Sequence, residues 1–431
     1  MHRLVALPQG TPARGRRAGQ EIPGEGRQKT IILLFLPQLF IVARITEVAE
    51  GIFQIRVEDR KIRYFEALWQ IPEGITYNAY LLKGDKCSIL FDTVKEEFSG
   101  EFLEALREVE DISNIKYLVV HHMEPDHSGA IPALLEENPE IEVLGHPLTK
   151  GMIESFFGLR PRFRAVKDQE LELCGRRIRF VSTPWLHWPE TIMSYLPEQG
   201  ILLSCDAFGS YGIPEEVSSR DVLPYFRETR KYLANVIGHY RRNVIQAIEK
   251  LRGLDVRLIL PSHGPVWTEP KAIVELYEGL ASGSKREKKA VAVYASMYGA
   301  VRKAVRRALE KFSSLGFEVL EFPFTDSSWA NIADAIGEME DSPMLVVGAP
   351  TYEAGTFPVM DMIVNLIAEK IGREKRILII SSFGWGGVAG KRLAERLKDF
   401  STVRVVEFRG FPSPKELEEI DRAAEELAEG L

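Results

Sequence analysis

The chain of 431 residues is too long for one ordinary domain, and its length fits two or three domains that each bury a full core. Its composition, 45% hydrophobic and 27% charged, is that of a globular protein. The formal net charge of -7 argues against a general nucleic-acid surface, because phosphate binding needs a basic face. We therefore expect no nucleic-acid partner and a small substrate.

The first 44 residues differ in character from the rest. Residues 1–29 are rich in Gly, Pro and Arg, and an apolar run over residues 30–43 follows. This run is shorter than the roughly 20 residues that a membrane span needs, and Val42-Ala43-Arg44 is a poor signal-peptide cleavage site. We expect residues 1–44 to be a disordered or non-native leader, and we expect no membrane association.

The next part of the chain alternates between strand and helix patterns. Apolar residues alternate in the predicted strands, the turn Gly84-Asp85 joins two of them into a hairpin, and the predicted helices have apolar residues at helical spacing. The strands cover residues 52–57, 77–82, 87–92, 117–120 and 141–145, and the helices cover residues 98–109 and 128–135, with Ser128 as the cap. This order predicts a layered α/β sandwich.

A cluster of metal-binding side chains follows the strand of residues 117–120. Residues 121–129 read His-His-Met-Glu-Pro-Asp-His-Ser-Gly, although the whole chain has only eight histidines. Three later predicted strands lead to His187, Asp206 and His263. Each of these has an ordinary structural explanation on its own, as a packed histidine or a cap. Together, imidazoles and carboxylates at the ends of four strands indicate a site for two metal ions.

Beyond the predicted helix of residues 224–251, the small and charged residues 283–289 indicate a linker. The part that follows has continuous apolar strands separated by helices, which predicts a doubly wound parallel sheet. The last helix opens with Ser413-Pro414-Lys415-Glu416, a capping-box pattern. The strands cover residues 290–295, 317–322, 344–348, 376–381 and 403–408.

Three loops at the carboxyl ends of these strands suit a flavin mononucleotide (FMN). In an open parallel sheet ligands bind at that edge. The first loop lies between strand and helix, where backbone amides and the helix dipole suit a phosphate, and the other two offer aromatic faces to a flat ring. Any one loop could be an ordinary turn, but all three together favour a cofactor. The loop residues are Ser296, Met297, Tyr298, Gly299, Ala300, Val301, Pro350, Thr351, Tyr352, Ser382, Phe383, Gly384, Trp385, Gly386 and Gly387.

The cysteines do not suggest a disulfide. Cys87, Cys174 and Cys205 are far apart in the sequence and form no C-x-x-C pair, so neither a disulfide framework nor a thiolate zinc site is indicated. We expect buried free thiols in a reducing compartment, and therefore a cytoplasmic protein.

With these motifs the chain resembles the flavodiiron proteins, also called A-type flavoproteins, from about residue 45 onward. The resemblance implies an αββα metallo-β-lactamase-like sandwich over residues 45–283 and a doubly wound flavodoxin-like parallel sheet over residues 284–431. The metal loop reads H-x-E-x-D-H, whereas zinc hydrolases of that fold read H-x-H-x-D-H. Glu124 thus provides a hard oxygen donor, which moves the metal preference towards iron.

The resemblance also implies the cofactors and their ligands. FMN and two iron ions are expected, with Asp206 bridging the irons. In some members of the family the counterpart of His127 turns away from the metal. His121 is expected to pack or to support the loop, and Trp188 and Tyr211 are expected to line the pocket. The remaining ligands are expected to be His122, Glu124 and His187 for one iron, and Asp126, His127 and His263 for the other.

The implied activity is reduction of dioxygen to water or of nitric oxide to nitrous oxide. Electrons come from an external donor, which the resemblance leaves open among a rubredoxin, a reductase and a reduced deazaflavin. A head-to-tail homodimer, alone or within a dimer of dimers, is implied, because the flavin and the irons of one chain are too distant for fast transfer. Two alternatives stay open: a zinc-dependent hydrolase with a flavodoxin appendage, and a flavin electron carrier whose metal domain is structural.

The first flavin loop departs from the family pattern. It usually continues S-M-Y-G-N-T, but Ala300 and Val301 stand in the last two places. Each lost hydrogen bond to the phosphate would cost about 0.5 to 1.5 kcal/mol. Arg302 or Lys303, in the first helical turn, is our candidate for neutralising the phosphate instead.

Overall fold

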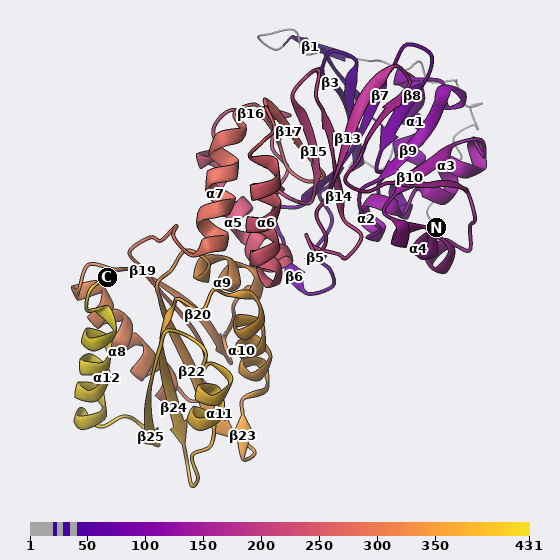
Figure 1. Cartoon of the computed structure of the whole chain (residues 1–431). Coiled ribbons are helices and arrows are strands. Elements are labelled where there is room, and N and C mark those ends of the chain that lie inside the picture. The colour runs from indigo at the N-terminus through magenta and orange to yellow at the C-terminus, as the bar shows by residue number, and fades with distance from the viewer. Residues whose placement is uncertain (1–19, 24–28, 35–40) are drawn as a thin grey trace, which may run out of the picture.

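The computed structural model describes residues 20–23, 29–34 and 41–431, and its first part is built from two sheets packed face to face (Figure 1). One sheet has the order β1-β2-β3-β4-β7-β8-β9-β10-β11 and the other β12-β13-β14-β15-β17-β18-β16. The strands of the first are Gln20–Pro23, Lys29–Leu34, Ile41–Ala49, Ile52–Asp59, Ile75–Lys83, Ser88–Phe91, Ile115–Val120, Glu142–Gly145 and Arg162–Ala165. Those of the second are Glu170–Leu173, Arg176–Ser182, Ile192–Leu196, Ile201–Cys205, Leu258–Pro261, Val266–Trp267 and Ser218–Ser219. A small hairpin, β5 (Tyr64–Phe65) and β6 (Trp69–Gln70), stands apart from both.

Alternation of side chains along the strands builds the core between the two sheets. Phe91 and Val119 of the first sheet belong to the same buried cluster as Phe180 and Leu203 of the second. The intervening residues point outward and are covered by helices, so the layers run helix, sheet, sheet, helix. The helices are α1 (Ser99–Val109), α2 (Pro125–Ser128), α3 (Ile131–Glu137), α4 (Pro147–Phe157), α5 (Phe226–Tyr232), α6 (Arg241–Leu251) and α7 (Pro270–Ser282).

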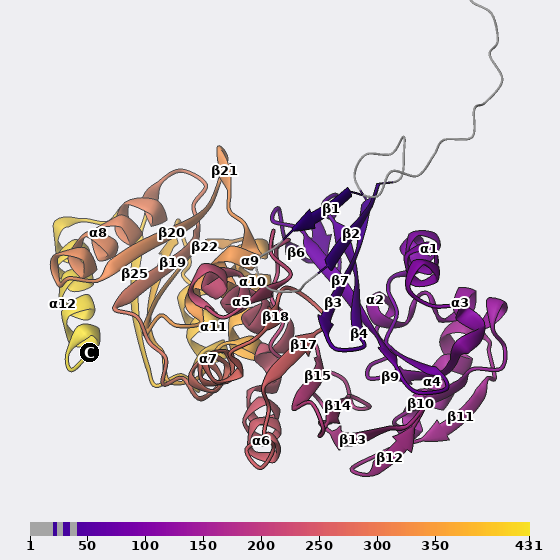
Figure 2. The ribbon, with the colours of Figure 1, turned by 90° about the horizontal axis from the view of Figure 1, so that it is seen from above.

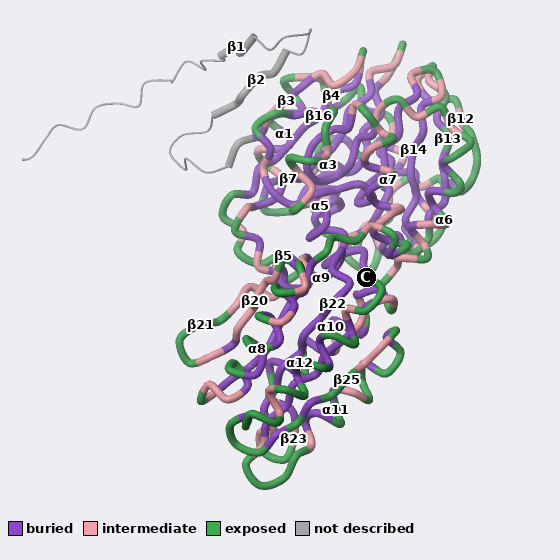
Figure 3. The backbone as a smooth tube through the Cα atoms, turned by 90° about the vertical axis from the view of Figure 1, so that its left-hand side faces the viewer, coloured by how far each residue is buried: buried purple, intermediate pink, exposed green. Residues whose placement is uncertain are grey.

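The second part of the chain is a parallel sheet with helices on both faces. Its order, β21-β20-β19-β22-β24-β25, has β19, the first strand in sequence, inside the sheet. The strands are β19 (Lys289–Ala295), β20 (Glu318–Thr325), β21 (Ser328–Trp329), β22 (Met344–Tyr352), β23 (Gly355–Thr356), β24 (Arg376–Phe383) and β25 (Thr402–Arg409). One face packs on α8 (Ala300–Ser314) and α12 (Pro414–Ala428), and the other on α9 (Ile332–Met339), α10 (Pro358–Lys370) and α11 (Ala389–Arg396). The buried backbone follows these strands, while the loops at the far end are largely exposed (Figure 3).

Helices α5 and α9 lie side by side where the two parts of the chain meet (Figure 2), and buried ion pairs join the two parts there. Nζ of Lys231 lies 2.7 Å from Asp334, and Nη1 of Arg230 lies 2.8 Å from Asp341. Both cations are almost fully buried, so each depends on its partner for solvation. The two parts of the chain therefore share a specific, charge-paired contact.

One local prediction is confirmed and two need correction. Ser413 and Glu416 form the predicted capping box of α12. The predicted helix of residues 224–251 is interrupted by a π-helical turn, Leu233–Ile237, and by two 3-10 turns, Leu223–Tyr225 and Gly238–Tyr240. Ser128 does not cap a helix but is the last residue of α2, because Pro125 already starts the helical turn. Further 3-10 turns lie at Glu96–Phe98 and Ile112–Asn114.

Most of the expected leader, residues 1–44, lies outside the described residues. Within it, β1 pairs with β2, and β2 pairs with β3, in antiparallel register. None of the helices in the described ranges is both long and apolar enough to cross a membrane.

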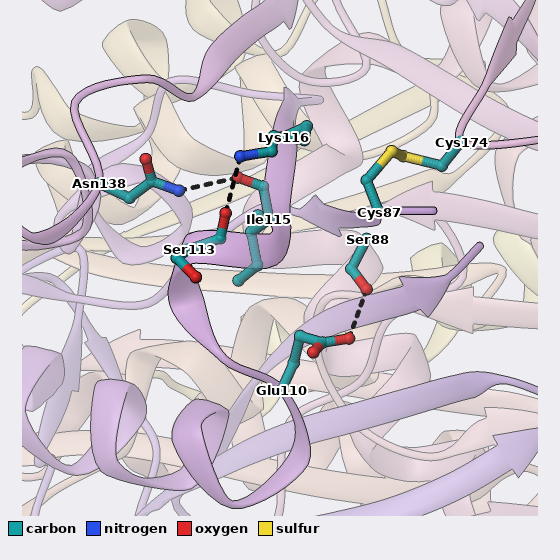
Figure 4. Close-up of a disulfide and its surroundings, with 8 residues drawn as sticks. All are labelled: Cys87, Ser88, Glu110, Ser113, Ile115, Lys116, Asn138 and Cys174. Atoms are coloured by element: carbon teal, nitrogen blue, oxygen red, sulfur yellow. Dashed lines mark hydrogen bonds between the residues drawn. A yellow bond between two sulfur atoms is a disulfide. The ribbon is translucent and has the colours of Figure 1, made fainter. Parts of the chain in front are cut away.

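The prediction of free thiols is wrong for two of the three cysteines. Cys87 and Cys174 form a disulfide with their Cα atoms 5.2 Å apart (Figure 4), whereas Cys205 is free and buried. Cys87 lies in the turn between β7 and β8, and Cys174 in the turn between β12 and β13. The face-to-face sheets bring these two turns together, and the backbone N–H of Asp85 donates to the carbonyl of Cys174 at 3.0 Å.

Candidate metal and flavin sites

The predicted metal ligands converge at one edge of the sandwich. His122 and Glu124 follow the end of β9 in the first sheet, whereas Asp206 follows β15 and His263 follows β17 in the second. His187 lies in the loop between β13 and β14. The two sheets therefore supply ligands to the same place from opposite sides.

One group of donors contains His122, Glu124, His187 and Asp206, whose ligand atoms all lie within 4.8 Å of one another. Oε2 of Glu124 lies 2.9 Å from Nε2 of His187 and 3.1 Å from Nε2 of His122. Oδ2 of Asp206 lies 3.3 Å from Nε2 of His187. Two imidazoles and two carboxylates thus face a common centre.

A second group contains Asp126, His127 and His263. Oδ2 of Asp126 lies 3.4 Å from Nε2 of His263. Oδ1 of Asp206 lies 2.9 Å from Nε2 of His127 and 3.2 Å from Nε2 of His263. Because its other oxygen faces the first group, the Asp206 carboxylate has the geometry of a bridge between two ions.

The donors have little else to bind within the described part of the protein. Several buried donor atoms lie near one another but form no hydrogen bond of normal geometry with any described residue, namely Nε2 of His187, Nε2 of His263, Oδ2 of Asp206 and both carboxylate oxygens of Asp126. Buried polar atoms are almost always satisfied in folded proteins, so a cluster of unsatisfied ones requires an explanation. Metal ions coordinated by these atoms would satisfy all of them at once.

The charges of the clustered histidines and carboxylates also indicate a metal site. Burial alone lowers the pKa of a histidine, but the hydrogen bonds that His122 donates to the carboxylates of Glu124 and Glu190 outweigh burial and raise the pKa of His122 to about 10. For His263 too, interaction with the negatively charged carboxylates of Asp126 and Asp206 outweighs burial and raises the pKa to about 10. Burial raises the pKa of Glu124, yet His122 and His187 hold it well below its usual value. The carboxylates therefore attract positive charge strongly, and a metal ion can provide it in place of protons.

Residues outside the predicted ligand set hold the ligands in place. Oε1 of Glu190 lies 3.1 Å from Nδ1 of His122, the carbonyl of Thr76 lies 2.7 Å from Nδ1 of His263, and the hydroxyl of Tyr232 donates to Asp206 at 3.0 Å. The sequence analysis missed all three. Glu190, three residues after His187 in the same loop, was the most accessible to sequence reasoning, whereas the contacts of Thr76 and Tyr232 exist only in the folded chain.

His121 supports the metal loop from behind, as the sequence analysis expects. Its Nδ1 lies 2.7 Å from Asp92 and its Nε2 lies 2.8 Å from the hydroxyl of Ser194. Trp188 lies edge-on to the His122 ring, with the ring centroids 4.8 Å apart. Tyr211 is buried and packs against Tyr232, with the ring centroids 5.1 Å apart.

The three predicted flavin loops lie at one edge of the parallel sheet, since β22 pairs with both β19 and β24. Gly299 has φ +86° at the start of α8, a conformation that lets the backbone turn at the expected phosphate position. Tyr298 and Trp385 are exposed, at 83% and 94%, so both aromatic faces are free for a flat ring. Gly384 and Gly386 also have open space around them. The residues present fit an FMN.

Not every residue of these loops faces a ligand. The hydroxyl of Thr351 accepts the backbone N–H groups of Val388 and Ala389, and it fixes the start of α11. Val301 is buried and packs toward Gly348 in the sheet. A cavity of about 250 Å³ beside the first loop is lined by Ser296 and Met297 and also by residues of β20 and beyond that the sequence analysis did not include, namely Phe324, Thr325, Asp326, Trp329 and Phe357.

Fold and donors together define a two-domain protein: a metallo-β-lactamase-like domain with a dinuclear donor set and a flavodoxin-like domain. Residues 75–264 match the family model described as ODP family beta lactamase. The chain is 32% identical over 360 residues to the nitric oxide reductase of Moorella thermoacetica, covering 81% of this chain and 89% of the relative. It is 31% identical over 402 residues to the rubredoxin-oxygen oxidoreductase of Megalodesulfovibrio gigas, covering 90% of this chain and 98% of that relative.

Among solved structures, a variant of the flavo di-iron protein from Thermotoga maritima superimposes with a TM-score of 0.83 at 34% identity, covering 88% of this chain and 96% of that chain. The chain belongs to the family of flavodiiron proteins, the type A flavoproteins. The predicted family and the predicted fold class are confirmed.

Proposed function

We propose that this protein is an oxidoreductase that reduces dioxygen to water, nitric oxide to nitrous oxide, or both. The observation that carries the proposal is Glu124, whose carboxylate lies within 3.1 Å of two imidazoles in the place where zinc hydrolases have a histidine. Replacing an imidazole by a carboxylate shifts the metal preference of a site from zinc towards iron. The similarity to enzymes named as a nitric oxide reductase and a rubredoxin-oxygen oxidoreductase agrees with this chemistry.

In this proposal each donor group holds one iron. His122, Glu124 and His187 would hold the first ion, and Asp126, His127 and His263 would hold the second. Asp206, whose two oxygens face the two groups, would serve both ions. When bound, the two iron ions and the FMN would supply the electrons that the gas accepts.

The residues of the chain provide the frame for that chemistry. Tyr232 fixes one oxygen of Asp206 by donating its hydroxyl hydrogen, and this keeps the bridge in one orientation. The Trp188 ring packs perpendicular to the His122 ring and contacts that ligand from one side.

The flavin loops support a head-to-tail homodimer as part of the proposal. Tyr298 and Trp385 expose large aromatic surfaces at the flavin edge. Near the metal cluster, Trp185 and Phe156 are also exposed, and Phe156 contacts Trp188. Pairing the two edges between subunits would bury both apolar surfaces and bring each flavin to a metal pair. Dimers of this kind could associate further into a dimer of dimers, and sedimentation would measure the assembly.

The electron donor is proposed to be a separate protein or reduced cofactor, either a rubredoxin, a reductase or a reduced deazaflavin. The relative from Megalodesulfovibrio gigas is named for rubredoxin. The cytoplasmic location expected from the sequence stays a prediction. Cell fractionation would test it, and the Cys87–Cys174 disulfide makes the result informative because disulfides are rare in that compartment.

The test is metal and flavin analysis of protein purified without oxygen, followed by consumption of each gas on an electrode. We expect two iron ions and one FMN per chain, with steady consumption of dioxygen or nitric oxide once a chemical donor is added. Two zinc ions with esterase activity would instead indicate the hydrolase alternative. Flavin reduction with no consumption of either gas would indicate the electron carrier.

A further inference from the structure

We propose that Glu190 is a positioning residue that fixes the imidazole of His122 and makes the His122 metal position the tighter of the two. The inference rests on the proposed metal binding and deepens it. Glu190 is fully buried in the loop that also carries His187, so one short segment controls two donors of the same group.

The contacts of Glu190 set the tautomer of His122. Its Oε1 lies 3.1 Å from Nδ1 of His122 and accepts the backbone N–H of Met123 at 2.9 Å. A carboxylate can only accept, so Nδ1 of His122 must carry the hydrogen. Nε2, which faces Glu124 and Asp206, is then left with its lone pair for a metal.

The second donor group has no equivalent support. Nδ1 of His263 lies 2.7 Å from the neutral carbonyl of Thr76, and Nδ1 of His127 has no hydrogen-bond partner in the part of the chain that the structure describes. A carboxylate partner makes an imidazole a stronger electron donor than a carbonyl does. The two metal positions are therefore unequal, although both have imidazole and carboxylate donors.

Glu190 also holds the metal loop itself. Through the N–H of Met123 it fixes the backbone between His122 and Glu124, which orients both side chains of the loop at once. Its other oxygen, Oε2, is buried without a partner among the described residues. A buried carboxylate that is only half satisfied is costly, so a residue with a merely structural role would be better replaced by an apolar one.

The experiment compares the parent chain with Glu190→Gln, Glu190→Ala and Glu190→Asp, each as the full chain with FMN. Metal-free protein is titrated with Fe(II) under argon and, in parallel, with Co(II), whose visible absorption reports the geometry of each site. Glu58→Gln is the matched control, because Glu58 is equally buried but its ion pairs are with arginines such as Arg44 and Arg56.

We expect the parent to bind two ions with separate affinities. In Glu190→Gln the affinity for the more tightly bound ion should fall by about 10 to 100-fold, while the affinity for the other ion changes little. The two binding steps of the titration should therefore merge. In Glu190→Asp the two affinities should differ by less than in the parent but by more than in Glu190→Gln. In Glu58→Gln they should differ as much as in the parent. FMN content should not change in any variant.

Two results would overturn the proposal. One is an affinity of the tighter step in Glu190→Gln within about threefold of the parent. The other is equal weakening of both steps, which indicates a general loss of charge. Gln has the shape of Glu and keeps the acceptor for Met123, so Glu190→Gln remains the decisive variant if Glu190→Ala fails to fold. Failure of the parent to bind iron at all would instead contradict the proposed function.

Discussion

Nε2 of His127 lies 2.9 Å from Oδ1 of Asp206, inside the donor cluster and fully buried. The ring of His263 packs beside it, with the centroids 4.9 Å apart. His127 therefore points into the site in this protein, unlike its counterpart in those members of the family where it turns away. Its position supports the proposal that it is a ligand.

The first prediction concerns His127. The substitution His127→Ala should reduce the bound iron from about two ions per chain to about one, because it leaves the second group with too few donors while the first group stays intact. Elemental analysis against protein concentration measures this. The control is His239→Ala, which removes an exposed histidine remote from the cluster. Two full ions in His127→Ala would mean that His127 does not bind metal.

The second prediction concerns Glu124. The substitution Glu124→His restores the loop pattern of zinc hydrolases and should raise the affinity for zinc relative to iron by about tenfold, or ~1.4 kcal/mol. Competition between Zn(II) and Fe(II) at equal free concentration measures the ratio. Consumption of both gases should fall with the iron content. An unchanged ratio would show that the metal preference is set elsewhere.

The third prediction concerns the disulfide. Cys87 and Cys174 are 87 residues apart, and the closed loop contains His122, Glu124 and His127. Replacing both cysteines by serine should lower the free energy of unfolding by about 2–4 kcal/mol, because the unfolded chain regains the freedom of a long loop. Denaturant unfolding with and without a thiol reductant measures this. The reductant should weaken the parent and leave the double variant unchanged, and the opposite pattern would contradict the role of the bond.

The sequence was sufficient for features that depend on local pattern. The strand before His122, the parallel strands of the second domain and the capping box at Ser413 all follow from periodicity and short-range chemistry, which the sequence contains in full. The side chains that converge as candidate metal donors could also be proposed from the sequence, since each follows a predicted strand.

Features that depend on long-range packing could not be predicted. Cys87 and Cys174 meet only because two turns of facing sheets are adjacent. Glu190 contacts His122, which is 68 positions away in the sequence, and Tyr232 donates to Asp206, which is 26 positions away. No spacing rule connects such pairs. Thr325 and Asp326 were missed because the predicted strand stops at residue 322, whereas β20 continues to Thr325 and its end lines the cavity beside the flavin loop.

The last prediction concerns the altered phosphate loop. Val301 is turned into the core and cannot reach a phosphate, but Arg302 is exposed, its guanidinium reaches the Gly299 turn, and its backbone N–H lies 3.3 Å from the hydroxyl of Ser296. A charged hydrogen bond to the phosphate would be worth about 1.5–3 kcal/mol, so Arg302→Ala should weaken FMN binding by roughly 10 to 100-fold.

Quenching of FMN fluorescence by flavin-free protein measures the dissociation constant. Lys303→Ala tests the other candidate, and we expect a smaller effect because an exposed ammonium is strongly hydrated and flexible. Lys398→Ala is the control, since Lys398 is exposed and paired with Glu395. Raising the salt concentration should reduce the difference between Arg302→Ala and the parent, because screening weakens the interaction with the phosphate. If Arg302→Ala and Lys303→Ala both bind FMN as tightly as the parent, neither cation replaces the missing polar side chains, and the backbone amides of the loop alone hold the phosphate.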